Sequence, residues 1–136
     1  MCLTIQVRLV IEMKTIVAKA DLENEELFRK ASDILKSGGL VAFPTETVYG
    51  LGGDALNPKA SEKIYSAKGR PSDNPLIVHI ADTASVWELA AEVSTQAQML
   101  MEAFWPGPLT IIFKKKDIVP HETTGGLETV AIRMPS

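Results

Sequence analysis

A segment rich in glycine and hydroxyl side chains, residues 44–53, directly follows an apolar run over residues 40–43. Thr45, Thr47 and Tyr49 supply hydroxyl groups in this segment, and its three glycines would let the backbone come close to a ligand. Successive backbone N–H groups in such a loop can form a concave nest for an anion. A tight turn that only changes the chain direction is the alternative, and the segment lacks the Gly-Lys-Ser/Thr ending of a P-loop.

Two cations, Lys68 and Arg70, stand where a predicted helix ends, and Asn74 follows the arginine four positions later. Cations at a helix C-terminus interact favourably with the helix dipole, which is the simplest explanation of the pair. The functional alternative is a phosphate clamp. In such a clamp Arg supplies a two-pronged donor and Lys a point charge, and both neutralise a phosphoryl group during transfer. Asn74 would add a neutral donor.

His79 and Arg133 each stand within or next to an apolar, strand-like run. His79 either faces a site or is a hydrogen-bonded core histidine. Arg133 is costly to bury unless it is paired, and its partner would be either a carboxylate ligand or an acidic side chain of this chain. Because the chain has one cysteine, Cys2, and one further histidine, His121, the sequence predicts no metal site built from these residue types.

The length and charge of the chain limit the classes of function. With 136 residues, of which 46% are apolar, the sequence predicts one domain with a hydrophobic core. The net charge of −3 argues against a broad basic surface for nucleic acid, although it allows a local anion pocket. A single cysteine allows no internal disulfide, which favours a reducing, cytoplasmic location. The apolar N-terminal stretch is too short to span a bilayer, so no membrane partner is predicted.

Hydrophobic periodicity predicts a mixture of strands and helices. The predicted strands cover residues 15–20, 40–43, 76–80, 109–113 and 129–134, and residues 40–43 and 76–80 have the continuous apolar composition of strands buried on both faces. The predicted helices cover residues 22–36, 58–69, 83–91 and 95–104, with Asn57, Asp82 and Ser94 as N-caps. This order predicts an α/β (α+β) fold, a mixed sheet flanked by helices.

The sequence also predicts the structure of the segments that lie between these elements and at the two ends of the chain. Trp105-Pro106-Gly107-Pro108 is predicted to stop the last helix with an aromatic ring packed beneath it, and residues 117–127 to form a polar loop. Residues 1–13 are predicted to be an N-terminal extension or an edge strand, and residues 14–136 a single domain. Because the chain stops at Pro135-Ser136, directly after a strong predicted strand, we expect this domain to be incomplete at its C-terminus.

Several of these segments together resemble the YrdC family, in its order and at its spacing, over roughly residues 14–136. The segments that carry the resemblance are GLVAFPTETVYGL (residues 39–51), KGRP (68–71), NPL (74–76), HI (79–80), WPGPLT (105–110) and TVAIRMP (129–135). The resemblance implies a YrdC-like domain, a twisted mixed α/β sheet with a positive cavity. The family continues beyond Ser136 with a Ser-x-Asn segment that contacts threonine and nucleotide, and this segment is absent from the sequence.

The resemblance also implies a reaction, because YrdC-family enzymes are L-threonylcarbamoyladenylate synthases, a class of nucleotidyltransferase. They join L-threonine, bicarbonate and ATP into threonylcarbamoyl-AMP and pyrophosphate. A threonylcarbamoyl-transfer complex then modifies the adenosine next to the anticodon of tRNA. Mg²⁺ would accompany ATP, with no tightly bound cofactor.

The same resemblance implies roles for individual residues, with Lys68 and Arg70 as the catalytic pair. By motif position, Thr47, His79 and Arg133 would contact L-threonine, Lys68, Arg70, Asn74 and Thr129 would hold the nucleotide, and Thr45 and Tyr49 would line the pocket.

Three other functions remain open from the sequence. A YrdC-like domain could bind double-stranded RNA or tRNA without catalysis, although the acidic net charge counts against this. The carbamoyl-transfer domain of hydrogenase-maturation proteins shares the fold, but its role needs attached acylphosphatase and zinc-finger regions, and this chain has no CxxC. Dihydroxybutanone-phosphate synthase is a related fold whose acidic metal-binding motifs are not found here.

Overall fold

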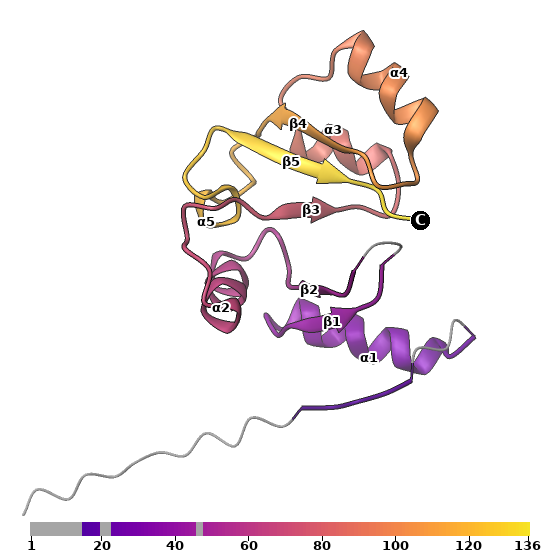
Figure 1. Ribbon diagram of the computed structural model, residues 1–136, viewed down its shortest axis with the longest axis vertical. Coiled ribbons are helices and arrows are strands. Elements are labelled where there is room, and N and C mark those ends of the chain that lie inside the picture. Colours follow the sequence, from indigo (N-terminus) through magenta and orange to yellow (C-terminus); the bar gives the residue numbers. More distant parts are fainter. Residues whose placement is uncertain (1–14, 20–22, 46–47) are drawn as a thin grey trace, which may run out of the picture.

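The computed structural model describes residues 15–19, 23–45 and 48–136 (Figure 1). Its helices are α1 (Glu25–Lys36), α2 (Pro58–Lys68), α3 (Ala84–Leu89), α4 (Thr95–Phe104) and α5 (His121–Thr124). Its strands are β1 (Val41–Phe43), β2 (Gly50–Gly52), β3 (Ile77–His79), β4 (Thr110–Lys114) and β5 (Thr129–Arg133). This mixture confirms the predicted α/β (α+β) class.

Within the described residues the strands form two sheets. β1 and β2 pair as an antiparallel hairpin, with Val41 opposite Gly52 and Phe43 opposite Gly50. The second sheet has the order β3-β5-β4, and its central strand β5 is parallel to β3 and antiparallel to β4. Figure 1 shows α4 above this three-stranded sheet and α3 behind it, and the hairpin with α1 below it. The two sheets therefore face each other across the middle of the molecule.

The hydrophobic core lies on one face of the three-stranded sheet. Val78, Ile132 and Phe113 point from β3, β5 and β4 into this core, where they pack against apolar residues of α3 and α4. Trp105 is 8% exposed, and its Nε1 donates a hydrogen bond to the carbonyl oxygen of Leu109 at 2.7 Å. This confirms the predicted helix stop with an aromatic ring packed beneath it. Because side chains alternate along a strand, every second residue of the sheet faces away from this core.

The helix boundaries follow from side-chain caps. Asn57 and Ser94 each accept a backbone N–H from the first turn of α2 and α4, at 3.1 and 3.2 Å. The Asp82 carboxylate does the same for the first turn of α3 at 2.9 Å. Gly69 ends α2 in the left-handed conformation, with φ of 59°, which glycine adopts without steric cost. These observations confirm Asn57 and Ser94 as N-caps. Asp82 lies one residue before Thr83, the N-cap of α3, and α3 is shorter than the predicted helix over residues 83–91.

Two strands are less buried than their apolar composition predicted. Ala42, in the centre of β1, is exposed, and Ile77 and His79 are exposed on either side of the buried Val78 in β3. The prediction of burial on both faces is therefore wrong. The physical reason in β3 is that helices cover only one face of its sheet, so the alternate side chains remain accessible.

Residues 15–19, the described part of the predicted first strand, form no regular structure. Ile16 and Val17 are exposed, and no described strand pairs with this segment. The apolar alternation therefore misled the prediction, because a strand needs a partner for its backbone groups. Residues 1–14 lie outside the described residues, so the predicted extension over residues 1–13 and the domain boundary at its end stay predictions.

The predicted polar loop over residues 117–127 contains a helical turn, α5, that sequence analysis missed. Two of its threonines, Thr123 and Thr124, are 2% and 1% exposed. Their polar character suggested a solvated loop, but their hydroxyl groups are hydrogen-bonded inside the protein, which removes the cost of burying them. The described part of the chain holds no helix with the length and apolarity that a membrane span requires.

Candidate functional site

Strand pairing brings the two predicted threonine contacts together on the open face of the three-stranded sheet. His79 of β3 lies beside Arg133 of β5, and Arg133 lies beside Thr110 of β4. Side chains paired in this way point to the same face and stand about 5 Å apart. Because the adjacent residues Val78 and Ile132 point into the core, the row of His79, Arg133 and Thr110 faces away from it. An imidazole, a guanidinium and a hydroxyl group thus converge from three strands.

The open face continues with an apolar row and a second polar row. Ile77, Ala131 and Ile112 form the apolar row, and Ile77 and Ile112 are 48% and 68% exposed. The predicted nucleotide contact Thr129 lies beyond it, beside Lys114. Polar groups for an anion therefore flank a strip of accessible apolar surface on one face of one sheet.

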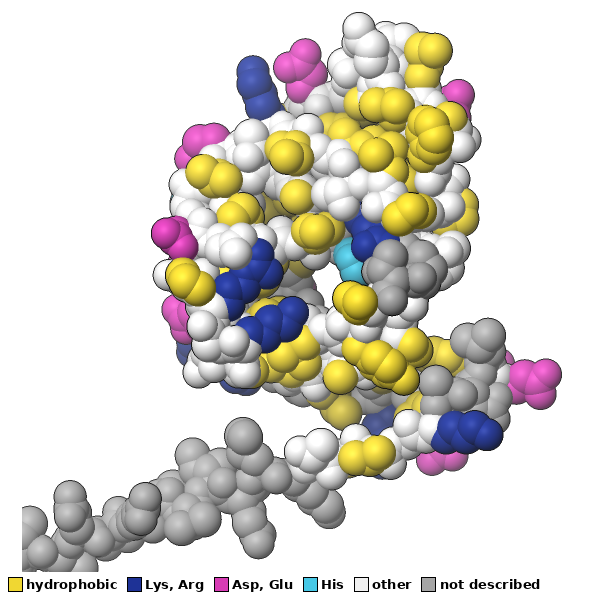
Figure 2. Space-filling view, in the orientation of Figure 1, with side chains coloured by type: hydrophobic (Ala, Val, Ile, Leu, Met, Phe, Trp, Pro, Cys, Tyr) yellow, Lys and Arg dark blue, Asp and Glu magenta, His cyan; other side chains and the backbone are white. Residues whose placement is uncertain are grey.

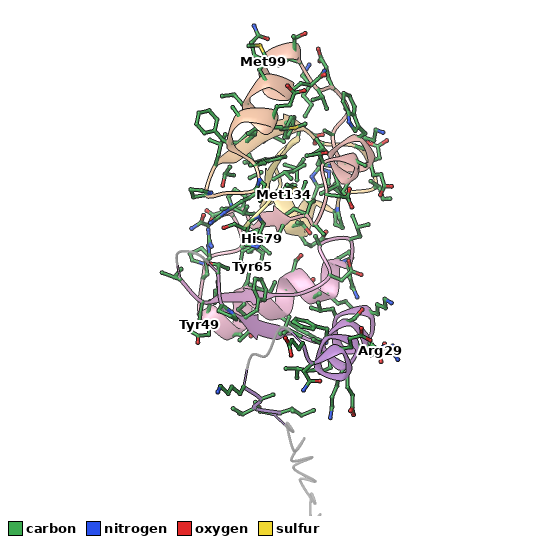
Figure 3. All side chains as sticks on the ribbon, turned by 90° about the vertical axis from the view of Figure 1, so that its right-hand side faces the viewer. Arg29, Tyr49, Tyr65, His79, Met99 and Met134 are labelled. Atoms are coloured by element: carbon green, nitrogen blue, oxygen red, sulfur yellow. The ribbon has the colours of Figure 1, made fainter. Side chains whose placement is uncertain are left out.

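The β1–β2 hairpin lies opposite this face. The ring of Phe43 in β1 meets the imidazole of His79 edge-on, with ring centroids 6.0 Å apart and planes inclined by 67°. Figure 3 shows His79 between the three-stranded sheet and the hairpin, and Figure 2 shows the molecule hollowed between them, with Lys or Arg and histidine side chains on the wall. The hairpin and the sheet are thus two sides of one hollow.

The glycines of β2 make room for the Phe43 ring. A Cβ atom added to Gly52 would lie 2.7 Å from that ring, and one added to Gly50 would lie 3.1 Å from it. Neither glycine is left-handed, so Gly50–Gly52 is a strand fitted to an aromatic ring. An anion nest elsewhere in the segment 44–53 stays a prediction, because residues 46 and 47 lie outside the described residues.

The hydroxyl-bearing residues of the segment 44–53 differ in their contacts and exposure. Thr45 Oγ1 accepts a hydrogen bond from Val48 N at 3.2 Å and donates one to Val48 O at 2.6 Å, so its hydroxyl is bonded to both backbone groups of Val48. Tyr49 is 79% exposed. Thr47, the third predicted threonine contact, lies outside the described residues. The pocket-lining roles of Thr45 and Tyr49 stay predictions.

Arg70 and Asn74 meet in the loop between α2 and β3. Arg70 Nη2 donates hydrogen bonds to Asn74 Oδ1 at 2.5 Å and to the carbonyl oxygen of Pro75 at 3.2 Å. Among the described residues, the buried Nε of Arg70 has no hydrogen-bond partner. Lys68 lies in the last turn of α2 with its side chain exposed. A hydrogen-bonded guanidinium thus follows an exposed lysine by two positions, and these two cations are the residue types expected of a phosphate clamp.

Arg133 is oriented by a hydrogen bond, whereas the main effect of the protein on His79 is desolvation. Arg133 Nε donates a hydrogen bond to the carbonyl oxygen of Gly107 at 3.3 Å, which orients its guanidinium plane. Gly107 belongs to the proline-rich turn after α4, and its N–H is bonded to Met134 O at 2.7 Å. The protein packed around His79 lowers the pKa of its imidazole by desolvation, so the ring is neutral at pH 7. A neutral imidazole can accept one hydrogen bond and donate another.

Two site features were missed by sequence reasoning. Thr110 was read only as part of a motif, although its position at the start of β4 puts it beside Arg133. The turn containing Gly107 was read as a helix stop, but it also orients Arg133.

A separate shallow hollow along α1, lined by Glu25, Phe28, Arg29 and Ser32, contains none of the predicted site residues. Among the described residues, no three His, Cys, Asp or Glu side chains are grouped to hold a metal ion.

Comparison with known proteins shows to which family this chain belongs. Residues 33–136 match the model of the Sua5/YciO/YrdC family, which carries the description "Telomere recombination". The chain belongs to this family. The match covers both walls of the hollow and includes every described residue that was predicted to contact a substrate. The resemblance seen in the sequence motifs is therefore confirmed.

Several Sua5/YciO/YrdC proteins are similar to this chain. It is 50% identical over 124 residues to the threonylcarbamoyl-AMP synthase of Pyrococcus abyssi, covering 91% of this chain and 36% of the relative. It is 54% identical over 113 residues to the enzyme of that name from Bacillus subtilis, covering 82% and 33%. The crystal structure of P. abyssi Sua5 complexed with L-threonine matches with a TM-score of 0.81 and 54% identity, covering 82% of this chain and 33% of that one. The chain thus spans about a third of the length of these relatives.

Proposed function

We propose that this chain forms the substrate site of an L-threonylcarbamoyladenylate synthase. The observation that carries the proposal is the row of His79, Arg133 and Thr110 on the open sheet face, opposite the hairpin. The relatives named threonylcarbamoyl-AMP synthase support it, as does the L-threonine bound to P. abyssi Sua5. The reaction, its substrates and its place in tRNA modification are part of the proposal.

L-Threonine fits the polar row by its chemistry. Arg133 offers a planar donor fork for the carboxylate, and the hydrogen bond to Gly107 O orients that fork. The neutral imidazole of His79 would bond to the amine or the β-hydroxyl group, and its contact with Phe43 limits its rotation. Thr47 is proposed to add a further contact from the segment between the hairpin strands.

The nucleotide is proposed to lie between the Arg70 loop and the far polar row. Arg70 and Lys68 would contact the phosphates, since the Asn74 and Pro75 oxygens hold the guanidinium of Arg70 in place and Lys68 is exposed. The amide nitrogen of Asn74 stays a donor, because its oxygen already accepts from Arg70. Thr129 would add a hydroxyl group. Mg²⁺ enters as part of the substrate MgATP, coordinated by phosphate oxygens and water.

The proposed reaction needs positioning and charge stabilisation more than acid or base groups. The threonine amine and bicarbonate first give N-carboxythreonine and water. A carboxylate oxygen of this carbamate then attacks the α-phosphorus of ATP, and the bond from that phosphorus to the bridging oxygen of pyrophosphate breaks. Lys68 and Arg70 would stabilise the charge that builds on the α-phosphate and on the departing pyrophosphate. The facing hairpin would shield the unstable carbamate from water.

The similarity to these relatives also supports a proposal for the next reaction, which uses threonylcarbamoyl-AMP. Threonylcarbamoyl-AMP is an activated acyl group, so its use requires an acceptor and a transfer catalyst. We propose that a threonylcarbamoyl-transfer complex passes the group to tRNA in the cytoplasm. The names of the relatives are the support for this step.

Titration calorimetry with MgATP, with and without L-threonine and bicarbonate, tests the proposal. We expect MgATP to bind and to bind more tightly when L-threonine is present. In a pyrophosphate-release assay, Arg70→Ala should lower the rate at least about tenfold, because one charge-assisted contact to the transferred group is lost.

Arg29→Ala is the matched control for this variant. It removes a guanidinium whose ion pair with Glu25 is exposed on α1, far from the hollow, and should leave the rate unchanged. Equal rates for the wild type and Arg70→Ala would refute the clamp, and the lack of binding of either substrate would refute the proposed site in this chain.

A further inference from the structure

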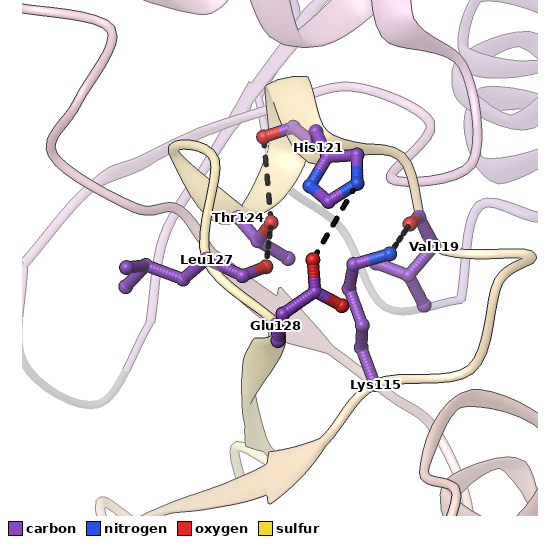
Figure 4. Close-up of polar contacts among 6 residues, drawn as sticks. All are labelled: Lys115, Val119, His121, Thr124, Leu127 and Glu128. Carbon is purple, nitrogen blue, oxygen red and sulfur yellow. Dashed lines mark hydrogen bonds and ion pairs between the residues drawn. The ribbon is translucent and has the colours of Figure 1, made fainter.

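The short helix α5 is fixed to the three-stranded sheet by contacts that involve none of the proposed substrate residues (Figure 4). The hydroxyl group of Thr124 donates to Leu127 O at 2.7 Å, which closes the turn after the helix. Lys115 Nζ donates to Val119 O at 3.0 Å and ties the segment before α5 to the end of β4. These contacts tie α5 to the segments that leave β4 and enter β5.

Thr123, the neighbour of Thr124, joins three other segments to this helix. Its Oγ1 donates to the carbonyl oxygen of Ala55 at 2.7 Å and lies 2.9 Å from Ser61 Oγ. Because a hydroxyl group has one proton, Ser61 must be the donor to Thr123. The backbone oxygen of Thr123 also accepts from Leu76 N at 3.0 Å. One residue thus connects the segment before α2, the first turn of α2 and the segment that leads into β3.

The segments joined at Thr123 are those that carry the proposed phosphate clamp. Ser61 lies on α2, whose C-terminal end presents Lys68 and Arg70. Leu76 follows Asn74 by two positions. A second contact acts on the same loop, since a Cβ atom on Gly125 would lie 2.9 Å from Asp73 O, which shows how closely the end of α5 and this loop approach.

The two hydroxyl groups of this arrangement are buried from water. Ser61 and Thr123 are 1% and 2% exposed, and Ala60 beside Ser61 is fully buried. A hydrogen bond between buried neutral groups is worth about 1 kcal/mol, and leaving its partners unsatisfied costs more. Loss of the Thr123 hydroxyl group would leave the buried Ser61 hydroxyl and the part-buried Ala55 carbonyl without their present partner.

We propose that Thr123 is a positioning residue for nucleotide binding, and this inference rests on the proposed function of the Arg70 loop. Thr123 holds α2 and the loop over residues 69–76 at a fixed place relative to the sheet that bears His79 and Arg133. It does not touch the substrates. Its loss therefore weakens the binding of MgATP more than that of L-threonine, whose contacts on the sheet are kept in register by the strand pairing.

The kinetic test compares Thr123→Val, which removes the hydroxyl group at nearly constant shape, with Thr123→Ser, which retains it. For Thr123→Val we expect the KM for MgATP to rise about tenfold, the equivalent of one to two lost hydrogen bonds, with less than about a twofold change in the KM for L-threonine. Thr123→Ser should restore the wild-type values.

Thr124→Val is the matched control, because it removes an equally buried hydroxyl group from the same helix that bonds only within α5 and its following turn. It should lower the unfolding midpoint as much as Thr123→Val does but leave the ratio of the two KM values unchanged. The same ratio in Thr123→Val and Thr124→Val, or no rescue by serine, would overturn the inference.

Hydrogen exchange of the free protein tests the positioning without reference to activity. Thr123→Val should speed amide exchange in residues 69–76 about tenfold, while exchange in α4 stays at the wild-type rate. Unchanged exchange in residues 69–76 would overturn the inference even if the enzyme is active. Faster exchange in a protein that binds no MgATP would support the mechanical link and refute the proposed function instead.

Discussion

At the scale of single residues, the planarity of Arg133 matters as much as its charge. Its Nε is held by Gly107 O, which fixes the plane of the guanidinium. Arg133→Lys keeps the charge and loses the fork. We expect the KM for L-threonine to rise about tenfold to a hundredfold, the effect of one charge-assisted hydrogen bond, with a smaller change for MgATP. Steady-state kinetics with each substrate varied separately measures this difference.

Arg29→Lys is the control for that substitution, because Arg29 lies on α1 in an exposed ion pair with Glu25. It should leave both KM values unchanged. If Arg133→Lys raised the KM for MgATP more than that for L-threonine, Arg133 would belong to the nucleotide site.

The protonation of His79 links stability to pH in one direction. Desolvation lowers its pKa in the folded state below the ordinary value of 6.5, so the unfolded chain binds the proton more readily. The contribution of His79 to folding is therefore fully present above 6.5 and is lost as the pH falls through the lower, folded-state pKa. We expect wild-type protein to lose more unfolding free energy between about pH 7.5 and about pH 5.5 than His79→Asn does. Urea unfolding at both pH values measures this difference.

His121→Asn is the control for the pH experiment. His121 is exposed on α5, 3.7 Å from the Glu128 carboxylate, and lies outside the hollow. This variant should keep the part of the acid sensitivity that comes from His79. Equal pH dependence in wild type and His79→Asn would contradict a desolvated imidazole at this position.

At the scale of elements, the sequence predicted best where one local interaction decides the structure. Asn57 before Pro58 and Ser94 before α4 are capping signals that act within a single turn, and both helices begin where these residues predicted. The sequence did not predict β2 and α5, because the contacts that stabilise them come from other segments of the chain. β2 exists as a strand beside Phe43, and α5 is buried through partners on α2 and before β3, so neither shows a periodicity of its own. The convergence of His79 and Arg133 likewise depends on pairing between β3 and β5, which local sequence does not encode.

The close packing of the Phe43 ring against β2 predicts that a methyl group added at Gly52 lowers the stability of the protein. Gly52→Ala would bring a Cβ atom to 2.7 Å from the Phe43 ring, so the ring must move. We expect a loss of about 1–3 kcal/mol in unfolding free energy, typical of overpacking. Because that ring also contacts His79, the KM for L-threonine should rise as well. Urea denaturation and steady-state kinetics measure the two effects.

The double variant Phe43→Leu/Gly52→Ala tests the cause, since the smaller side chain leaves space for the added methyl group. It should be more stable than the sum of the two single losses predicts. Additive losses would mean that Gly52 is required for a reason other than the ring.

At the scale of the whole molecule, the two walls of the hollow differ in how firmly they are held. The three-stranded sheet is backed by the hydrophobic core, in which Ile132 is fully buried. The hairpin rests on α1, a helix without a buried residue. Such a difference predicts that the sheet opens only with global unfolding, whereas the hairpin and α1 open locally.

Substrates that contact both walls should reduce this difference. In hydrogen exchange without ligand, the amides of β5 should exchange slowest and those of α1 and the hairpin fastest. Addition of MgATP with L-threonine should slow exchange in β1 and β2 as well as in the loop over residues 69–76, because binding stabilises the folded arrangement of every segment that it contacts. α4 packs on the far side of the sheet and serves as the internal control. Protection confined to the sheet and to residues 69–76 would show that the hairpin is not a wall of the substrate site, and that the carbamate is shielded from water by another part of the protein.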